Sequence, residues 1–234
     1  MSAGYFQRLV QSLWRACWTA GLTTLFLFNG AISHAESGAA VVTETADSLP
    51  GYNIYRPANL DTRSTGLPVI AWANGGCARH DKTWKSVFER WASEGYFVIS
   101  ITLPPGVEDA AKADRSTVED QAAAIDWAVK ENDLSGSPYA GKLDIYRVVA
   151  AGNSCGGITS LALAGQDARV TSVFVLSGSS VGPGAKPEDA AAIMNRVSVP
   201  VGFVVGGKED MASDQADQDY DLLADGLAAM VVKR

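Results

Sequence analysis

Five short apolar runs recur along the chain, and longer amphipathic stretches separate them. The first, residues 67–74, has almost no polar position and ends in Gly75-Gly76. The later runs share this character and lie at residues 96–102, 146–151, 170–176 and 199–205. Runs that are apolar on both faces are typical of the central strands of a parallel sheet, so we predict a strand at each of them.

Helix-length stretches lie between these runs. Residues 84–94 carry apolar side chains at helical spacing, and Gly95 ends the pattern. Residues 116–119 (Ser-Thr-Val-Glu) have the pattern of a capping box that opens a second helix, and residues 190–197 and 214–229 are two further predicted helices. Alternating strands and helices imply right-handed crossovers. We therefore predict an α/β fold, with a mostly parallel sheet and helices on both faces.

Residues 1–35 are predicted to be a secretory signal peptide. Two arginines are the only charges of this segment, a short apolar run follows at residues 16–28, and small residues occupy the −3 and −1 positions of a break after Ala35. A membrane anchor is the alternative, but the run is shorter than the ~20 residues that span a bilayer, and threonines interrupt it. Without repeats or linkers, residues 36–234 are predicted to form one secreted or periplasmic domain with no stable membrane anchor.

The amino-acid composition indicates a folded domain and argues against some classes of binding partner. The chain of 234 residues is 47% hydrophobic, which is enough apolar mass to bury a core. It has 19 basic and 26 acidic residues and a net charge of −7. Because no basic stripe is present, we expect no nucleic-acid partner. No spacing of cysteine and histidine suggests a metal site, and we expect no cofactor.

One motif indicates catalysis. Gly152-Asn153-Ser154-Cys155-Gly156-Gly157 directly follows the third apolar run and precedes a helix-length stretch, so it is G-x-S-x-G between a strand and a helix. A nucleophile on such a sharp turn has a strained backbone, and the residues two before and two after it must be small. Gly152 and Gly156 meet that requirement for Ser154. An ordinary glycine-rich turn is the alternative.

Together with the upstream Trp72-Ala73-Asn74-Gly75-Gly76-Cys77, this motif resembles the α/β-hydrolase superfamily, in particular its secreted esterase and dienelactone-hydrolase-like branches. The resemblance covers about residues 50–234. It implies a serine hydrolase that cleaves a small-molecule or polymeric carboxylic ester, with Ser154 as the nucleophile and an acyl-enzyme as the intermediate.

The resemblance also implies an oxyanion hole near the two cysteines of the predicted mature chain. One donor would be the backbone N–H of Cys155, and the second would be that of Gly76 or Cys77. Asn74 departs from lipase-like members, which carry histidine at this position. Cys77 and Cys155 would lie on adjacent loops and are candidates for a disulfide in an oxidising compartment, where it would hold the two donor loops together. Two free thiols are the alternative.

The acid of a catalytic triad follows a later strand in this family. Here the last predicted strand leads into Gly206-Gly207-Lys208-Glu209-Asp210. By resemblance Asp210 matches the acid, and Glu209 and Asp214 are lesser candidates. A carboxylate there would orient the base and stabilise its imidazolium. A solvated turn or a helix N-cap is the alternative.

The base should be a histidine that follows the acid. The sequence contains only His34, in the predicted leader, and His80, in a loop far upstream. Residues 228–234 resemble the start of the last strand, so we expect a C-terminally truncated chain whose last strand–helix unit is incomplete and whose triad histidine is lost. The alternative is a non-catalytic hydrolase-like binding domain or an inactive fragment.

Overall fold

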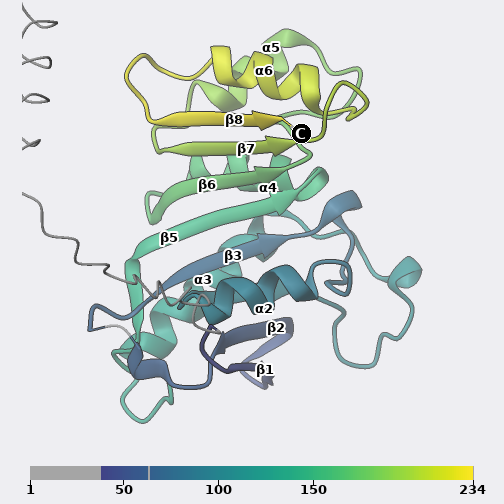
Figure 1. Ribbon diagram of the computed structural model, residues 1–234. Helices are drawn as coiled ribbons and strands as arrows, with labels where there is room; N and C mark the ends of the chain where they lie inside the picture. The colour runs from purple at the N-terminus through teal and green to yellow at the C-terminus, as the bar shows by residue number, and fades with distance from the viewer. Residues whose placement is uncertain (1–37, 63, 234) are drawn as a thin grey trace, which may run out of the picture. The chain divides into compact units, whose positions relative to one another are not determined.

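The computed structural model describes residues 38–62 and 64–233, so the predicted signal peptide lies outside the described residues. Within the described part, the strands form one eight-stranded sheet of order β1-β2-β4-β3-β5-β6-β7-β8 (Figure 1). The β1–β2 and β2–β4 pairs are antiparallel, and all the other pairs are parallel. The strands are β1 (Val41–Ala46), β2 (Leu49–Pro57), β3 (Leu67–Ala73), β4 (Phe97–Ile101), β5 (Leu143–Asn153), β6 (Val170–Leu176), β7 (Val201–Val205) and β8 (Ala229–Lys233).

Helices cover both faces of this sheet. Val69 and Ala71 of β3 join the core that α3 and α4 complete, whereas Ile70 and Trp72 join the core on the side of α2. The predicted α/β architecture is therefore confirmed. No helix among the described residues is long and apolar enough to cross a membrane. The helices are α2 (Lys85–Ser93), α3 (Val118–Asp133), α4 (Cys155–Ala164), α5 (Pro187–Met194) and α6 (Ser213–Asp221), with short 3₁₀ turns η1 (Leu60–Thr62), η2 (Gly75–Cys77) and η3 (Ala110–Lys112).

The five strands predicted from the apolar runs are present as β3 to β7, and the strand expected at residues 228–234 is present as β8. Three helix predictions need correction. The helix predicted at 190–197 begins and ends three residues earlier, as α5. The capping box of α3 lies one residue later than predicted, because the Thr117 side chain accepts from the Asp120 N–H and the Asp120 carboxylate accepts from the Thr117 N–H. The helix predicted at 214–229 is wrong in its second half. α6 ends at Asp221, and the chain turns through Gly226 (φ +84°) into the edge strand β8.

A cluster of aromatic rings packs α2 against the sheet. The Trp72 ring of β3 is fully buried, and its centroid lies 5.1 Å from Phe88, 5.2 Å from Trp84 and 5.8 Å from Trp91. The tilted and edge-on geometry is the favourable one for aromatic pairs. These tryptophans therefore serve as packing residues between helix and sheet, as their helical spacing predicts.

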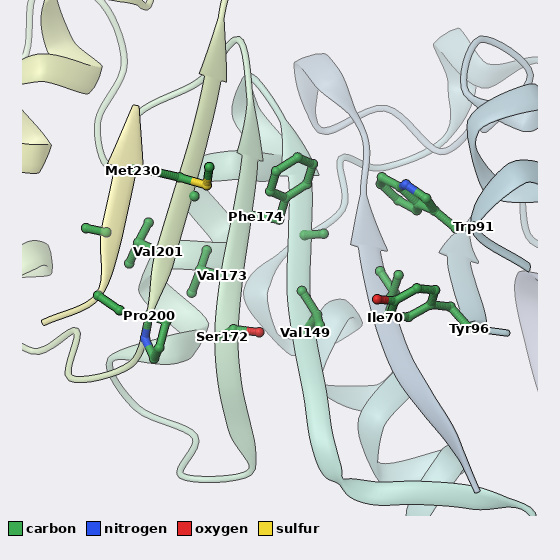
Figure 2. Close-up of a pocket in the computed structure, with 14 residues that line it drawn as sticks. Ile70, Trp91, Tyr96, Val149, Ser172, Val173, Phe174, Pro200, Val201 and Met230 are labelled. Carbon is green, nitrogen blue, oxygen red and sulfur yellow. The ribbon is translucent and has the colours of Figure 1, made fainter. Parts of the chain in front are cut away.

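Beyond Trp91, no helix among residues 38–62 and 64–233 covers the same face of the sheet. A cavity of about 520 Å³ lies there, and Figure 2 shows side chains from neighbouring strands standing side by side along it. Met230 of the edge strand is 54% exposed. An exposed apolar sheet face of this kind promotes association between protein molecules. The lining includes Ile70, Tyr96, Val149, Val173, Phe174, Val201 and Met230.

Candidate active site

Ser154 lies on the sharp turn that joins β5 to α4. Its backbone has φ +51° and ψ −117°, a region that residues with a side chain rarely adopt. The turn is held by the Ser154 N–H, which donates to Leu176 O (3.0 Å), and by Ser154 O, which accepts from the Gly157 N–H (2.8 Å). Serine often caps a helix, but this side chain makes no cap hydrogen bond and the residue is exposed. The hydroxyl group is therefore presented at the carboxyl end of the strand.

Two glycines allow this turn by letting three backbones approach closely. A Cβ on Gly152 would lie 2.2 Å from the carbonyl oxygen of Gly156. A Cβ on Gly156 would lie 2.0 Å from the carbonyl oxygen of Ala73, at the end of β3. Both distances are far inside van der Waals contact, so only glycine fits at either position. This is the steric requirement of the G-x-S-x-G motif.

A disulfide connects the turn to the loop after β3. Cys77 and Cys155 are bonded, with their Cα atoms 5.2 Å apart and 78 positions apart in sequence. The predicted pairing is confirmed, and two free thiols are excluded. Cys77 ends η2 with φ +51°, and Cys155 begins α4 directly after Ser154. The bond therefore ties the loop after β3 to the first residue of α4.

Asn74, which departs from the histidine of lipase-like members, fixes the start of that loop. It is 2% exposed, and its side-chain oxygen accepts from the Trp72 indole N–H at 2.8 Å. Its amide nitrogen donates to the carbonyl of Ile101, also at 2.8 Å. Both ends of the side chain are thus satisfied within the fold, and Asn74 acts as an anchor between β3 and β4.

The backbone N–H groups predicted to form the oxyanion hole differ in whether they already make a hydrogen bond. Cys155 lines the cavity of Ser154, whereas Gly76 and Cys77 belong to the adjacent loop and do not line it. Cys77 N–H donates to Asn74 O (3.1 Å). Among the described residues, the N–H of Gly76 meets no acceptor, and Gly76 itself is exposed. The first N–H groups of any helix lack an intrahelical acceptor, which applies to Cys155 at the start of α4. Cys155 and Gly76 therefore have N–H groups available to a ligand, whereas that of Cys77 is committed to the turn.

Asp210 and Ser154 line the same cavity, which has a volume of about 250 Å³. Asp210 follows β7, and its carboxylate accepts from the N–H groups of Gly206 (2.7 Å) and Ala212 (2.9 Å). Partial burial raises the pKa of Asp210, but the hydrogen bonds from Ala212, Gly206 and the Ser177 side chain outweigh it and hold the pKa below its ordinary value. The group is thus an anchored carboxylate at the cavity wall.

The lesser candidates for the acid lie elsewhere. Glu209 and Asp214 are exposed, and neither lines the cavity of Ser154. Ser177, which the sequence analysis missed, lines the cavity beside Asp210, helps to lower the pKa of that carboxyl, and has a strained φ of +41°. Ser177 directly follows the apolar run at residues 170–176, which places it at the carboxyl end of a strand. This position is the sequence signal from which Ser177 could have been predicted as a site residue.

His80 lies in the loop that follows η2. Its neighbour Arg79 pairs with Asp120 (2.6 Å), and buried Asp81 accepts from the Tyr55 hydroxyl (2.6 Å). These contacts hold the loop against α3 and β2. Within the part of the chain that the structure describes, no histidine lines the cavity of Ser154.

Comparisons with known proteins place the chain in a family. Residues 29–222 match the family model described as PETase: PET hydrolase-like. A solved structure described as a dienelactone hydrolase, from Klebsiella pneumoniae, is similar with a TM-score of 0.60 and 16% identity, over 83% of this chain and 85% of that chain. This identity shows a shared fold alone. No curated protein matches. Since the family model covers most of its length, this chain belongs to the PET hydrolase-like family of the α/β-hydrolase superfamily, and it has the fold of a hydrolase.

Proposed function

We propose that this protein hydrolyses carboxylic esters through an acyl-enzyme on Ser154. The observation that carries the proposal is the strained turn, which exposes an uncapped serine hydroxyl in a cavity that also holds an anchored carboxylate, Asp210. The names of the family and of the fold relative both refer to ester or lactone hydrolysis, which supports the same bond type. Export from the cytoplasm, as the leader predicts, is consistent with the disulfide.

In the proposed reaction, the Ser154 oxygen attacks the ester carbonyl carbon and its proton passes to a base. The carbonyl oxygen becomes an oxyanion, which accepts from the N–H groups of Cys155 and Gly76. Each such donor is typically worth about 3 kcal/mol of barrier lowering. Collapse of the tetrahedral intermediate breaks the bond to the alcohol oxygen, which takes back the proton from the base and leaves as the alcohol. The remaining acyl-serine is then hydrolysed by water to the carboxylic acid and free Ser154.

Asp210 would orient a histidine base and stabilise its positive charge. The printed sequence has no histidine after Asp210, and His80 does not line the cavity. A site without this base would keep only the weaker catalysis of binding and oxyanion stabilisation, which is roughly 10³–10⁴-fold over water in well-studied serine hydrolases. A second candidate function is a hydrolase-like binding domain, which is favoured because no histidine is among the described residues that line the cavity.

A fluorophosphonate probe separates the two candidate functions. It forms a covalent bond with a nucleophilic serine. We expect slow labelling of Ser154, measured by mass spectrometry of the digested protein, together with slow hydrolysis of p-nitrophenyl acetate. Ser154→Ala should abolish both signals. The matched control is Ser172→Ala, because Ser172 lies at the other cavity. A folded protein that is not labelled supports the binding domain, and labelling that persists in Ser154→Ala overturns the assignment of the nucleophile.

A further inference from the structure

We propose that Asp219 is a positioning residue, which clamps the loop at residues 177–183 so that this loop forms one wall of the cavity of Ser154. The proposal rests on the proposed function of that cavity. It concerns a side chain outside the cavity that acts on the site through Ser180.

The clamp is a contact at two points between a helix and a loop. Asp219 of α6 is 1% exposed, and Ser180 is fully buried. One carboxylate oxygen of Asp219 accepts from the Ser180 N–H at 2.5 Å, and the other accepts from the Ser180 hydroxyl at 2.5 Å. Because one residue supplies both donors, the pair fixes the orientation of the Ser180 backbone as well as its position.

The geometry of the loop shows what the clamp achieves. The residues on both sides of Ser180 line the cavity, whereas Ser180 does not. Ser180 therefore turns away from the cavity toward α6, at the middle of a segment whose other members face the proposed substrate site. The members that line the cavity are Ser177, Gly178, Ser179, Val181, Gly182 and Pro183.

The loop also touches both proposed catalytic residues. A Cβ on Gly178 would lie 3.0 Å from the backbone N and O atoms of Ser154, so the loop packs directly on the strained turn. Ser177 of the loop and Asp210 line the same cavity, and the Ser177 side chain helps to lower the pKa of the Asp210 carboxyl. A shift of this loop would therefore change the cavity wall, the support of Ser154 and the polar surroundings of Asp210 at the same time.

Burial of Asp219 is costly, which argues against a role in stability alone. No cation pairs with Asp219 among the described residues, and burial raises the pKa of this carboxyl although the Ser180 hydrogen bonds lower it. A buried charge without a partner of opposite sign is unfavourable, and a well-packed apolar residue often stabilises a fold as well or better. What the carboxylate provides, and an apolar residue does not, is a pair of acceptors for Ser180.

The test compares Asp219→Ala with Asp219→Asn in the full chain. Alanine removes both acceptors. Asparagine keeps the shape, accepting from the Ser180 N–H and donating to its hydroxyl oxygen. The matched control is Asp221→Ala, an exposed aspartate on the same helix. The readouts are the rate of Ser154 labelling by a fluorophosphonate, measured 20 °C below each variant's unfolding midpoint, and amide hydrogen exchange of residues 177–183.

We expect Asp219→Ala to slow labelling at least tenfold and to speed exchange of the loop at least tenfold. We expect Asp219→Asn to restore both readouts to within about threefold of the wild type, and Asp221→Ala to change neither. Wild-type exchange in Asp219→Ala, or failure of asparagine to rescue, would overturn the clamp. If Asp219→Ala does not fold, Ser180→Ala removes one of the two hydrogen bonds and should give a smaller change of the same sign.

The exchange readout needs no catalysis, so it separates this proposal from the proposed function. If the wild type is never labelled, the assignment of Ser154 fails while the exchange result still decides whether Asp219 holds the loop. If labelling occurs and the loop exchanges faster in Asp219→Ala with no change in labelling rate, the clamp is structural only and its positioning role is refuted.

Discussion

Removal of the Cys77–Cys155 disulfide should lower the free energy of unfolding by an amount that the length of the closed loop sets. The two cysteines are 78 positions apart. In the chain-entropy model, a loop of that length corresponds to about 4.5 kcal/mol at 25 °C, and losses measured for native disulfides are typically ~2–5 kcal/mol. In a domain of this size, 1 kcal/mol shifts the midpoint of thermal unfolding by roughly 2–4 °C. We therefore expect the double variant Cys77→Ala, Cys155→Ala to unfold about 5–15 °C lower than the wild type.

Circular dichroism under non-reducing conditions measures this shift. Reductant added to the wild type should reproduce it, because it opens the same Cys77–Cys155 bond. The bond also joins the two loops that carry the proposed oxyanion donors. Fluorophosphonate labelling of Ser154 in the double variant should therefore fall more than tenfold at a temperature where it remains folded. An unchanged midpoint would refute the loop-entropy reasoning, and an unchanged labelling rate would refute the preorganisation of the oxyanion hole.

Three further predictions concern the turn, the carboxylate and the open face. Gly152→Ala places a Cβ 2.2 Å from the carbonyl oxygen of Gly156 and should cost about 3 kcal/mol or more in unfolding free energy, whereas Gly182→Ala, with nothing within 4 Å, should stay within about 0.5 kcal/mol in denaturant titrations. Because the folded-state pKa of Asp210 is lowered, its contribution to stability is present above its ordinary pKa and is lost as the pH falls through the folded value. Asp210→Asn should thus destabilise at pH 7, and its unfolding curve should converge with that of the wild type in acid; a constant difference would contradict this. Met230→Lys should reduce binding of an apolar dye and light scattering on heating, and equal scattering would show that the open face does not drive association.

The sequence predicted the central strands and the last strand, β8, but not the first two. β3 to β7 are apolar on both faces, a pattern that is hard to mistake. β1 and β2 pair antiparallel at one edge, and β1 alternates between half-buried and exposed positions. Such a strand resembles a polar loop until its partner is known, which is why residues 41–57 received no strand prediction.

The prediction of the C-terminal helix failed for a related reason. Residues 222–228 carry leucines at a spacing compatible with a helix. The parallel register of Val201 with Ala229 requires extended chain at that point, so tertiary pairing overrides the local pattern. Gly226, with φ +84°, provides the turn between α6 and β8. A periodicity argument has no access to such a long-range register.

At the site, the sequence was informative at positions where steric constraints allow only one residue type. Glycine at 152 and 156 flanking Ser154 predicted a turn that only glycine allows, and the structure shows those contacts. The choice between the N–H groups of Gly76 and Cys77 could not be made from sequence. It depends on the hydrogen bond from Cys77 to Asn74, a backbone detail of a strained turn.

Asp219 illustrates a signal that the sequence contained but that could not be interpreted alone. α6 has four aspartates, which together read as a solvated acidic face. Three of them are exposed, whereas Asp219 follows Ser213 and Ala216 at three-residue spacing, and those two positions are buried. Helical geometry therefore puts one carboxylate on the inward face. Its partner Ser180 lies 39 residues upstream in a loop without periodicity, so only the fold can show why a charge at that position is tolerated. A buried carboxylate on an amphipathic helix is thus a reason to look for the backbone segment that it holds, and here that segment is the wall of the cavity of Ser154.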